Sequence, residues 1–312
     1  MVVNTIANRA VMCKTLIEAA KHDKDLVVLT SDSRGSASLV DFFKAFPERM
    51  IETGIAEQNL VGISAGLALN GKHPFVASPA CFLSMRSIEQ VKVDVAYSNK
   101  NVKLVGISGG VSYGALGASH HSLQDIAVTR AIPNLEVLIP ADRHETKAVF
   151  EYLVHSDKPA YVRLGRNPVE DCFTEENVQF EIGKASVMVE GTDITIAAVG
   201  ETVRVAMDAA NALKMDGVSV RVLNFTSLKP FDSEAVRKAV RETKGIVSVE
   251  EHSINGGLGS AVASVVAEEG GRLKIMGIPD ENVVTGVIQE VFAYYGITAD
   301  GIKNEINKLL SK

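Results

Sequence analysis

The sequence predicts an α/β protein of two domains, each a mostly parallel sheet with helices on both faces. Three observations lead to this fold class. At 312 residues the chain is too long for one typical domain and suits two, each with its own core. Its apolar fraction of 46% includes only 5% aromatics, and this aliphatic bias is typical of parallel sheets covered by helices. Apolar strand-like runs also alternate with helix-like segments, which indicates βαβ units.

The first half of the chain contains most of the predicted strands. Residues 4–21 predict an amphipathic helix, and DLVVLT at 25–30 predicts a buried strand that runs into the polar loop Ser31–Gly35. The almost wholly apolar residues 60–69 predict a tightly packed helix headed by Glu57. Further strands are expected at 73–77, 102–107, 135–139 and 160–164.

The second half begins where this pattern weakens into a polar stretch. We expect a first domain over 1–168, a linker over 169–190 and a second domain over 191–312. Strands of the second domain are expected at 193–200, 218–225 and 245–251.

Charge and cysteine content exclude several classes of protein. With 32 Lys+Arg against 38 Asp+Glu and no basic stripe, we expect no binding to nucleic acid or anionic lipid. No stretch approaches the ~20 apolar residues of a membrane span, and the N-terminus has no apolar signal core. Cys13, Cys81 and Cys172 are far apart and lack metal-ligand spacing, so we expect a cytoplasmic protein without metal ligands of its own.

One short stretch, IETGIAEQN at 51–59, stands where a strand-like segment gives way to a helix-like one. This places the carboxylate of Glu57 at the mouth of an α/β unit, where ligands collect in such folds. A simpler explanation is that the helix dipole favours negative charge in a first helical turn. The residues around Glu57 decide between the two.

Those residues resemble the transketolase family of thiamine-diphosphate enzymes. IETGIAEQN, followed by GISAGLALNGKHPFVAS, resembles the family's pyrimidine-binding domain. The resemblance continues through SGGVSYGALGASHHSLQDIAVTRAIPNLEVLIPADRHET and PAYVRLGRNP. SLKPFD and EEHSINGGLGSAVA resemble its C-terminal domain, which mainly serves assembly, so the likeness covers essentially the whole chain.

The resemblance implies a set of cofactor-binding residues. Glu57 matches the glutamate that activates thiamine diphosphate, by protonating N1′ of the pyrimidine so that the 4′-amino group acts as a base. Phe82 is the aromatic residue of ASPACFLSMRS that would stack on the pyrimidine, although it could also be ordinary core. Ser31 and Asp32 lie on a loop that approaches the thiazolium ring and the sugar in this family, although such a loop is often only a solvated turn.

The resemblance also implies substrate-binding residues. Of two adjacent histidines, His120 matches the catalytic one, whereas His121 falls where other members have a different residue. Arg166 matches an arginine that holds the sugar phosphate, and Arg163 is a less favoured alternative. We include Arg9, on the first predicted helix, among the substrate-binding candidates.

Three departures from the family pattern concern the donor and cofactor sites. Leu116 stands where transketolases carry an aspartate that reads a sugar hydroxyl, and Ser108 replaces a histidine that lines the donor site. An aromatic residue upstream of Phe82 is also missing, with Pro79 and Ala80 at that place. Both Leu116 and Ser108 are therefore candidate substrate-site residues, and the identity of the donor sugar stays undetermined.

The family's diphosphate site uses a Gly-Asp-Gly motif and an Asn to hold Mg²⁺, and no Gly-Asp-Gly occurs in this sequence. We therefore expect a subunit whose partner chain supplies the diphosphate domain and the Mg²⁺ ligands. A heterotetramer of two copies of each chain, associating through the C-terminal domain, is the family's habit.

The function expected from this resemblance is that of the C-terminal subunit of a split transketolase. Such an enzyme moves a two-carbon ketol unit from a ketose phosphate to an aldose phosphate. Two enzymatic alternatives stay open, namely a 1-deoxy-xylulose-5-phosphate synthase-like subunit and a 2-oxoacid dehydrogenase beta-like subunit. The alternative from another class is a non-catalytic assembly or regulatory subunit.

Overall fold

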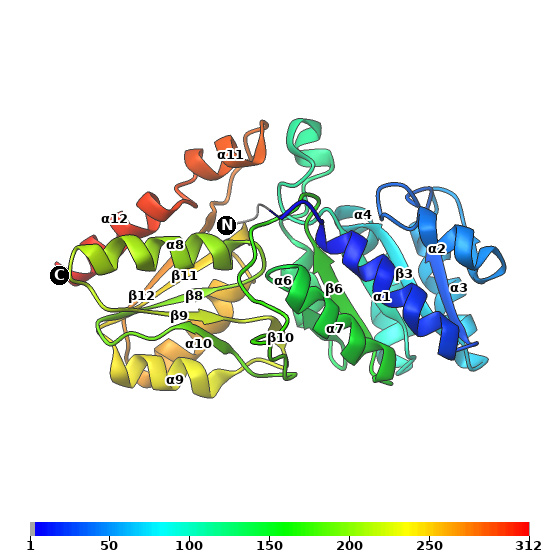
Figure 1. Cartoon of the computed structure of the whole chain (residues 1–312), viewed down its shortest axis with the longest axis horizontal. Coiled ribbons are helices and arrows are strands. Elements are labelled where there is room, and N and C mark those ends of the chain that lie inside the picture. The colour runs from blue at the N-terminus through cyan, green and yellow to red at the C-terminus, as the bar shows by residue number, and fades with distance from the viewer. Residues whose placement is uncertain (1–3, 312) are drawn as a thin grey trace.

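Two sheets organise residues 4–311, the part of the chain that this computed structural model describes (Figure 1). The first has seven strands in the order β10-β5-β6-β4-β3-β1-β2, and the second has five in the order β12-β11-β8-β9-β7. All neighbouring strands pair in parallel except β10 with β5 and β7 with β9. The predicted fold class is confirmed.

The first sheet is built from the five strands that the sequence predicts in this half of the chain, together with two short strands, β2 and β10, that it does not predict. Its parallel strands are β1 Leu26–Thr30, β2 Met50–Glu52, β3 His73–Pro79, β4 Lys103–Ile107, β5 Glu136–Leu138 and β6 Ala160–Leu164. The helical segments around it are α1 Asn8–His22, α2 Val40–Ala45, η1 Pro47–Arg49, α3 Glu57–Leu69, α4 Ala80–Met85, α5 Ile88–Gln90, η2 Val91–Tyr97, η3 Gly114–Ser119, α6 Asp125–Ala131 and α7 Arg143–His155.

Alternate side chains of each strand enter the cores on opposite faces of this sheet. Leu26 and Val28 of β1 pack with α1, α2 and α7, whereas Val27 and Leu29 pack with α3 and η2. All four side chains are buried, so the strand is apolar at consecutive positions, as expected where helices cover both faces.

The second sheet follows the same plan. It contains β7 Ser186–Val189, β8 Ile194–Ala198, β9 Val220–Asn224, β11 Ile246–Ser253 and β12 Leu273–Ile278. Its helices are α8 Thr202–Met215, α9 Ser233–Glu242, α10 Leu258–Glu269, α11 Ile288–Tyr294 and α12 Ala299–Leu310. Helices α8 and α12 pack against one face and α9 and α10 against the other. No helix in residues 4–311 is long and apolar enough to cross a membrane.

Strand β7 lies inside the stretch that the sequence predicts as a linker, residues 169–190. It pairs antiparallel with β9 and forms an edge of the second sheet. We propose to count it with the second domain, and to keep 1–168 as the first.

The two domains also join directly. Strand β10, Ser227–Lys229, follows the second-domain strand β9 yet pairs with β5 of the first sheet. Nearby, the buried carboxylate of Glu145 on α7 accepts hydrogen bonds from Ala141 N at 2.7 Å, Asn224 Nδ2 at 2.9 Å and Thr226 Oγ1. One apolar core runs across this junction. The second domain is therefore fixed against the first, next to the loops that carry the candidate residues.

Candidate active site

Glu57 is the first residue of α3, as predicted, and is only 4% exposed. The chain reaches it from β2 through Gly54, whose φ of +70° favours glycine. Within the described residues, the side-chain partner of its carboxylate is Arg86, whose Nη1 lies 3.2 Å from Oε2. A buried carboxylate thus stands at the carboxyl edge of the first sheet, where open α/β sheets bind ligands.

Phe82 stands beside this carboxylate because α4 starts directly after β3. Arg86 lies four residues further on, which puts the two side chains on one face of the helical turn. The guanidinium carbon of Arg86 is 3.9 Å from the centroid of the Phe82 ring, a cation–π contact. The same guanidinium therefore touches both Glu57 and Phe82. Arg86 is not among the site residues predicted from the sequence, although its i,i+4 spacing from Phe82 was a signal.

His120 completes this group. Its ring centroid lies 5.2 Å from that of Phe82 and 5.3 Å from that of Tyr113, both edge to face, and Ser119 Oγ lies 2.9 Å from its Nδ1. His121 is buried, donates from Nε2 to the carbonyl of Gly114 at 3.0 Å, and has its pKa lowered by burial. Of the two adjacent histidines, His120 is the one whose ring packs against Phe82.

Arg166 and Arg9 lie beyond Tyr113. The Arg166 guanidinium carbon is 5.2 Å from the Tyr113 ring centroid, and Arg9 Nε donates to the Arg166 carbonyl at 3.0 Å. Burial, and then the charge of Arg166, lower the pKa of Arg9. Two neighbouring guanidinium groups suit a phosphate. Arg163, the alternative, is buried and pairs with Asp125 and Glu251, so it is committed elsewhere.

Ser31 and Asp32 follow β1 at the same edge of the sheet. The buried Ser31 Oγ lies 2.7 Å from Ser78 Oγ at the end of β3. Asp32 is exposed and has a φ of +53°, and its backbone amide donates to Glu52 Oε1 at 2.6 Å. Within the described residues, no hydrogen bond or ion pair joins either residue to Glu57.

The two residues that depart from the family pattern differ in exposure. Ser108 follows β4, is fully buried with a φ of +55°, and its Oγ has no partner within residues 4–311. Leu116 lies on η3, four residues before His120, and is 55% exposed. An exposed leucine on the loop that carries His120 is available to a ligand.

The second domain holds the His120 loop. Glu251 Oε1 accepts from Val111 N at 2.8 Å. A Cβ on Gly117, where φ is +70°, would lie 2.6 Å from Thr285 Cγ2, and one on Gly114 would lie 2.9 Å from a carbonyl oxygen of the segment before α11. Figure 1 shows this loop beside that segment. The second domain therefore shapes the candidate site, in addition to the assembly role that the resemblance implies.

Glu251 belongs to a buried cluster in which one arginine serves several acids. Arg163 lies 3.8 Å from Asp125 Oδ2 and 3.4 Å from Glu251 Oε2. Glu201 is next to them, and its buried Oε1 has no hydrogen-bond partner in the described residues. Burial, and then the charge of Glu251, raise the pKa of Glu201 to about 8. We infer that Glu201 is protonated at neutral pH.

This cluster gives a pH-dependent prediction. Because the pKa of Glu201 is raised above its ordinary 4.5, the folded state holds a proton that the unfolded state releases. Stability is therefore lost as pH rises from about 4.5 through about 8. The free energy of unfolding of Glu201→Gln, relative to that of wild type, should be higher at pH 9 than at pH 6. The expected increase is on the order of 1–3 kcal/mol. Unfolding midpoints at both pH values test this, with the exposed Glu176→Gln as control. An unchanged difference would contradict it.

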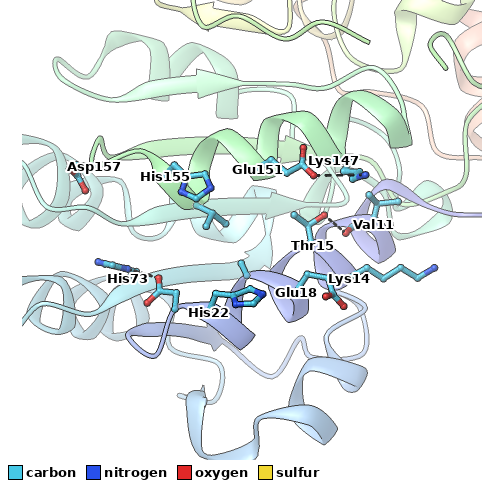
Figure 2. Close-up of a pocket in the computed structure, with 13 residues that line it drawn as sticks. Val11, Lys14, Thr15, Glu18, His22, His73, Lys147, Glu151, His155 and Asp157 are labelled. Atoms are coloured by element: carbon cyan, nitrogen blue, oxygen red, sulfur yellow. Dashed lines mark hydrogen bonds and ion pairs between the residues drawn. The ribbon is translucent and has the colours of Figure 1, made fainter. Parts of the chain in front are cut away.

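A separate groove lies elsewhere on the molecule. It has a volume of about 770 Å³ and runs between α1 and α7, with His22, His73 and His155 among its lining residues (Figure 2). None of the predicted site residues lines it. Within residues 4–311, no group of three or more His, Cys, Asp or Glu side chains could hold a metal ion. The arrangement able to hold an aromatic cofactor ring is the one around Glu57, where a buried carboxylate lies beside the partly exposed ring of Phe82.

Comparison with known families identifies the two domains. The model of the transketolase pyrimidine binding domain matches residues 4–170, and that of the transketolase C-terminal domain matches residues 183–302. The chain therefore belongs to the transketolase family. It consists of the pyrimidine-binding and C-terminal domains of that family, and it is a transferase subunit.

Individual relatives match over nearly their whole length. One of the subunits of an apulose-4-phosphate transketolase from Phocaeicola vulgatus is 51% identical, with 96% of each chain covered. The subunit SqwH of a 6-deoxy-6-sulfo-D-fructose transketolase from Clostridium sp. (strain MSTE9) is 38% identical over 92% of this chain and 89% of that one. A split gene transketolase, solved as an inactive beta4 tetramer, superposes with a TM-score of 0.89 at 37% identity, covering 98% of this chain and 99% of that one.

Proposed function

We propose that this chain is the pyrimidine-binding and C-terminal subunit of a split transketolase, which moves a two-carbon ketol unit from a ketose phosphate to an aldose phosphate. The observation that carries the proposal is a series of contacts at the carboxyl edge of the first sheet, in which Arg86 joins Glu57 to Phe82 and the Phe82 ring packs against His120. When bound, thiamine diphosphate supplies the nucleophilic carbon that attacks the ketose carbonyl.

Each residue of this group has a proposed role. Glu57 hydrogen-bonds the pyrimidine at N1′ and supplies the proton that this atom needs, and Phe82 fixes the ring by stacking. His120, partly exposed beside Phe82, moves a proton to or from the sugar. Arg166 and Arg9 bind the sugar phosphate. Ser31 and Asp32 border the site on the β1 side.

The diphosphate and its Mg²⁺ are assigned to a partner chain. Support comes from a set of exposed apolar side chains on α3, the helix that Glu57 begins, and on η2, which packs against α3. It includes Ile63, Leu69, Val93 and Tyr97, the last of which is 86% exposed. Apolar side chains gathered at a surface indicate a protein interface. We propose that the partner carrying the diphosphate half covers this surface.

Self-association of this chain through its second domain, in a complex of two copies of each kind of chain, completes the proposed assembly. The tetrameric split gene transketolase, whose chain superposes on 98% of this one, supports self-association. That tetramer is inactive, which is in keeping with a site that needs a second kind of chain.

The natural donor is proposed from the relative that is 51% identical, an apulose-4-phosphate transketolase. Because a less similar relative is a transketolase for a sulfonated sugar, overall likeness alone does not fix the donor. Leu116 is a residue of this chain that bears on the choice. An aspartate there would hydrogen-bond a sugar hydroxyl, whereas leucine leaves such a hydroxyl without a partner if the closed site excludes water.

Leu116→Asp should therefore shift the donor preference. An unpaired polar group costs about 1–3 kcal/mol, which is roughly ten- to hundredfold in discrimination. We expect the substitution to raise kcat/KM for xylulose 5-phosphate relative to apulose 4-phosphate by about that factor. The measurement is a donor panel on the complex reconstituted with the partner chain, with Ala118→Asp on the same exposed segment as control. If the ranking of donors stays the same, Leu116 does not face the donor.

A further inference from the structure

Arg86 occupies the space between the two residues to which the pyrimidine ring is assigned. Its Nη1 lies 3.2 Å from Glu57 Oε2, and its guanidinium carbon lies 3.9 Å from the centroid of the Phe82 ring. A guanidinium is planar and donates hydrogen bonds to a carboxylate, and a pyrimidine protonated at N1′ shares both properties. One side chain of the protein thus makes, at the same time, the two contacts proposed for the cofactor.

The contact has a reason in this chain alone. Glu57 is buried, and a buried carboxylate without a partner is strongly unfavourable. Within residues 4–311 its side chain pairs with Arg86 and no other cation. The pair therefore satisfies Glu57 whenever no cofactor is present.

We propose that Arg86 acts as a stand-in for the pyrimidine ring in the free subunit, and that thiamine diphosphate must displace it from Glu57 and Phe82 to bind. This inference rests on the proposed function, because it assumes that the pyrimidine binds there.

The geometry allows the displacement. Arg86 lies at the C-terminal end of α4, and about half of its side chain is exposed. In the described part of the chain, its only hydrogen bond to a side chain goes to Glu57. The guanidinium can therefore turn into solvent without breaking a second ion pair, whereas Glu57 and Phe82 are fixed by α3 and α4.

Two effects of opposite direction follow for Arg86→Ala. Removing the competing side chain should lower the Kd of the reconstituted complex for thiamine diphosphate, by roughly three- to tenfold for one half-exposed ion pair and one cation–π contact. The same substitution should lower the unfolding temperature of the isolated subunit without cofactor, because Glu57 loses its partner. If Arg86 had a purely structural role, its substitution would lower both the cofactor affinity and the unfolding temperature. If Arg86 bound the cofactor, its substitution would lower the cofactor affinity.

The experiment measures both quantities. Titration calorimetry at saturating Mg²⁺ gives the Kd of complexes made with wild type, Arg86→Ala and Arg86→Lys, and thermal unfolding gives the stability of each isolated subunit. Lysine keeps the charge but loses the planar contact, so its Kd should lie between the other two. Lys24→Ala, at an exposed position of the loop before β1, is the control.

The outcomes separate this inference from the proposed function. If the wild-type complex binds thiamine diphosphate and Arg86→Ala binds it equally well or more weakly, the stand-in role is overturned. If the wild-type complex does not bind thiamine diphosphate at all, the proposed function itself fails. Should Arg86→Ala not fold, Arg86→Gln, which keeps a hydrogen-bond donor but no charge, decides by the same two measurements.

Discussion

Glu57→Gln should give a folded chain that still assembles and binds thiamine diphosphate, but that loses nearly all activity. The amide NH2 can donate a hydrogen bond to N1′ of the pyrimidine, yet it cannot deliver the proton that N1′ needs. We expect kcat to fall by at least the ~10²–10⁴-fold typical of a positioned acid or base. The fold should be retained because glutamine matches glutamate in size and can still accept the hydrogen bond of Arg86.

The measurement is steady-state turnover of the reconstituted complex, alongside a cofactor titration and far-UV circular dichroism of the isolated chain. Glu89→Gln, in the short helix that follows α4, is a matched control and should turn over normally. Near-normal turnover of a folded Glu57→Gln complex would remove Glu57 from its assigned role.

The sequence predicted the main strands of both sheets because their apolar runs are long and their flanking loops polar. Each predicted strand is present within a few residues of its expected ends. Strand β2 has three residues and β7 lies in a polar stretch, so neither carries a sufficient local pattern. Strand β10 could not be predicted locally, because it forms only by pairing with β5 of the other domain.

The candidate site divides in the same way. Glu57 and His120 could be proposed from the sequence because they belong to contiguous motifs. In the structure, His120 packs against the Phe82 ring, and Glu57 pairs with Arg86, which contacts that ring. Contacts between different motifs could not be predicted from the sequence. The pairing of Arg86 with Glu57 joins two helices, and the packing of Thr285 against Gly117 joins two domains. Such contacts depend on how the elements pack, which no single stretch of sequence determines.

The second large effect concerns assembly. In residues 4–311 no group of acidic, histidine or cysteine side chains could hold a metal ion, and the sequence has no Gly-Asp-Gly motif. In the assembly that we propose, this chain supplies the pyrimidine half of the thiamine diphosphate site and the partner chain supplies the diphosphate half. The purified chain should show no ketol transfer, and its cofactor affinity should be weak, because stacking on Phe82 and one hydrogen bond to Glu57 must first displace Arg86.

Mixing is the direct test of this account. The chain is titrated with its candidate partner, a chain that carries Gly-Asp-Gly, in the presence of thiamine diphosphate, Mg²⁺, apulose 4-phosphate or xylulose 5-phosphate, and an aldose phosphate acceptor. We predict no activity from either chain alone, and ketol transfer that rises with added partner and saturates when the two chains are equimolar. Tight, Mg²⁺-dependent binding of thiamine diphosphate by this chain alone, or ketol transfer without the partner, would contradict the split active site.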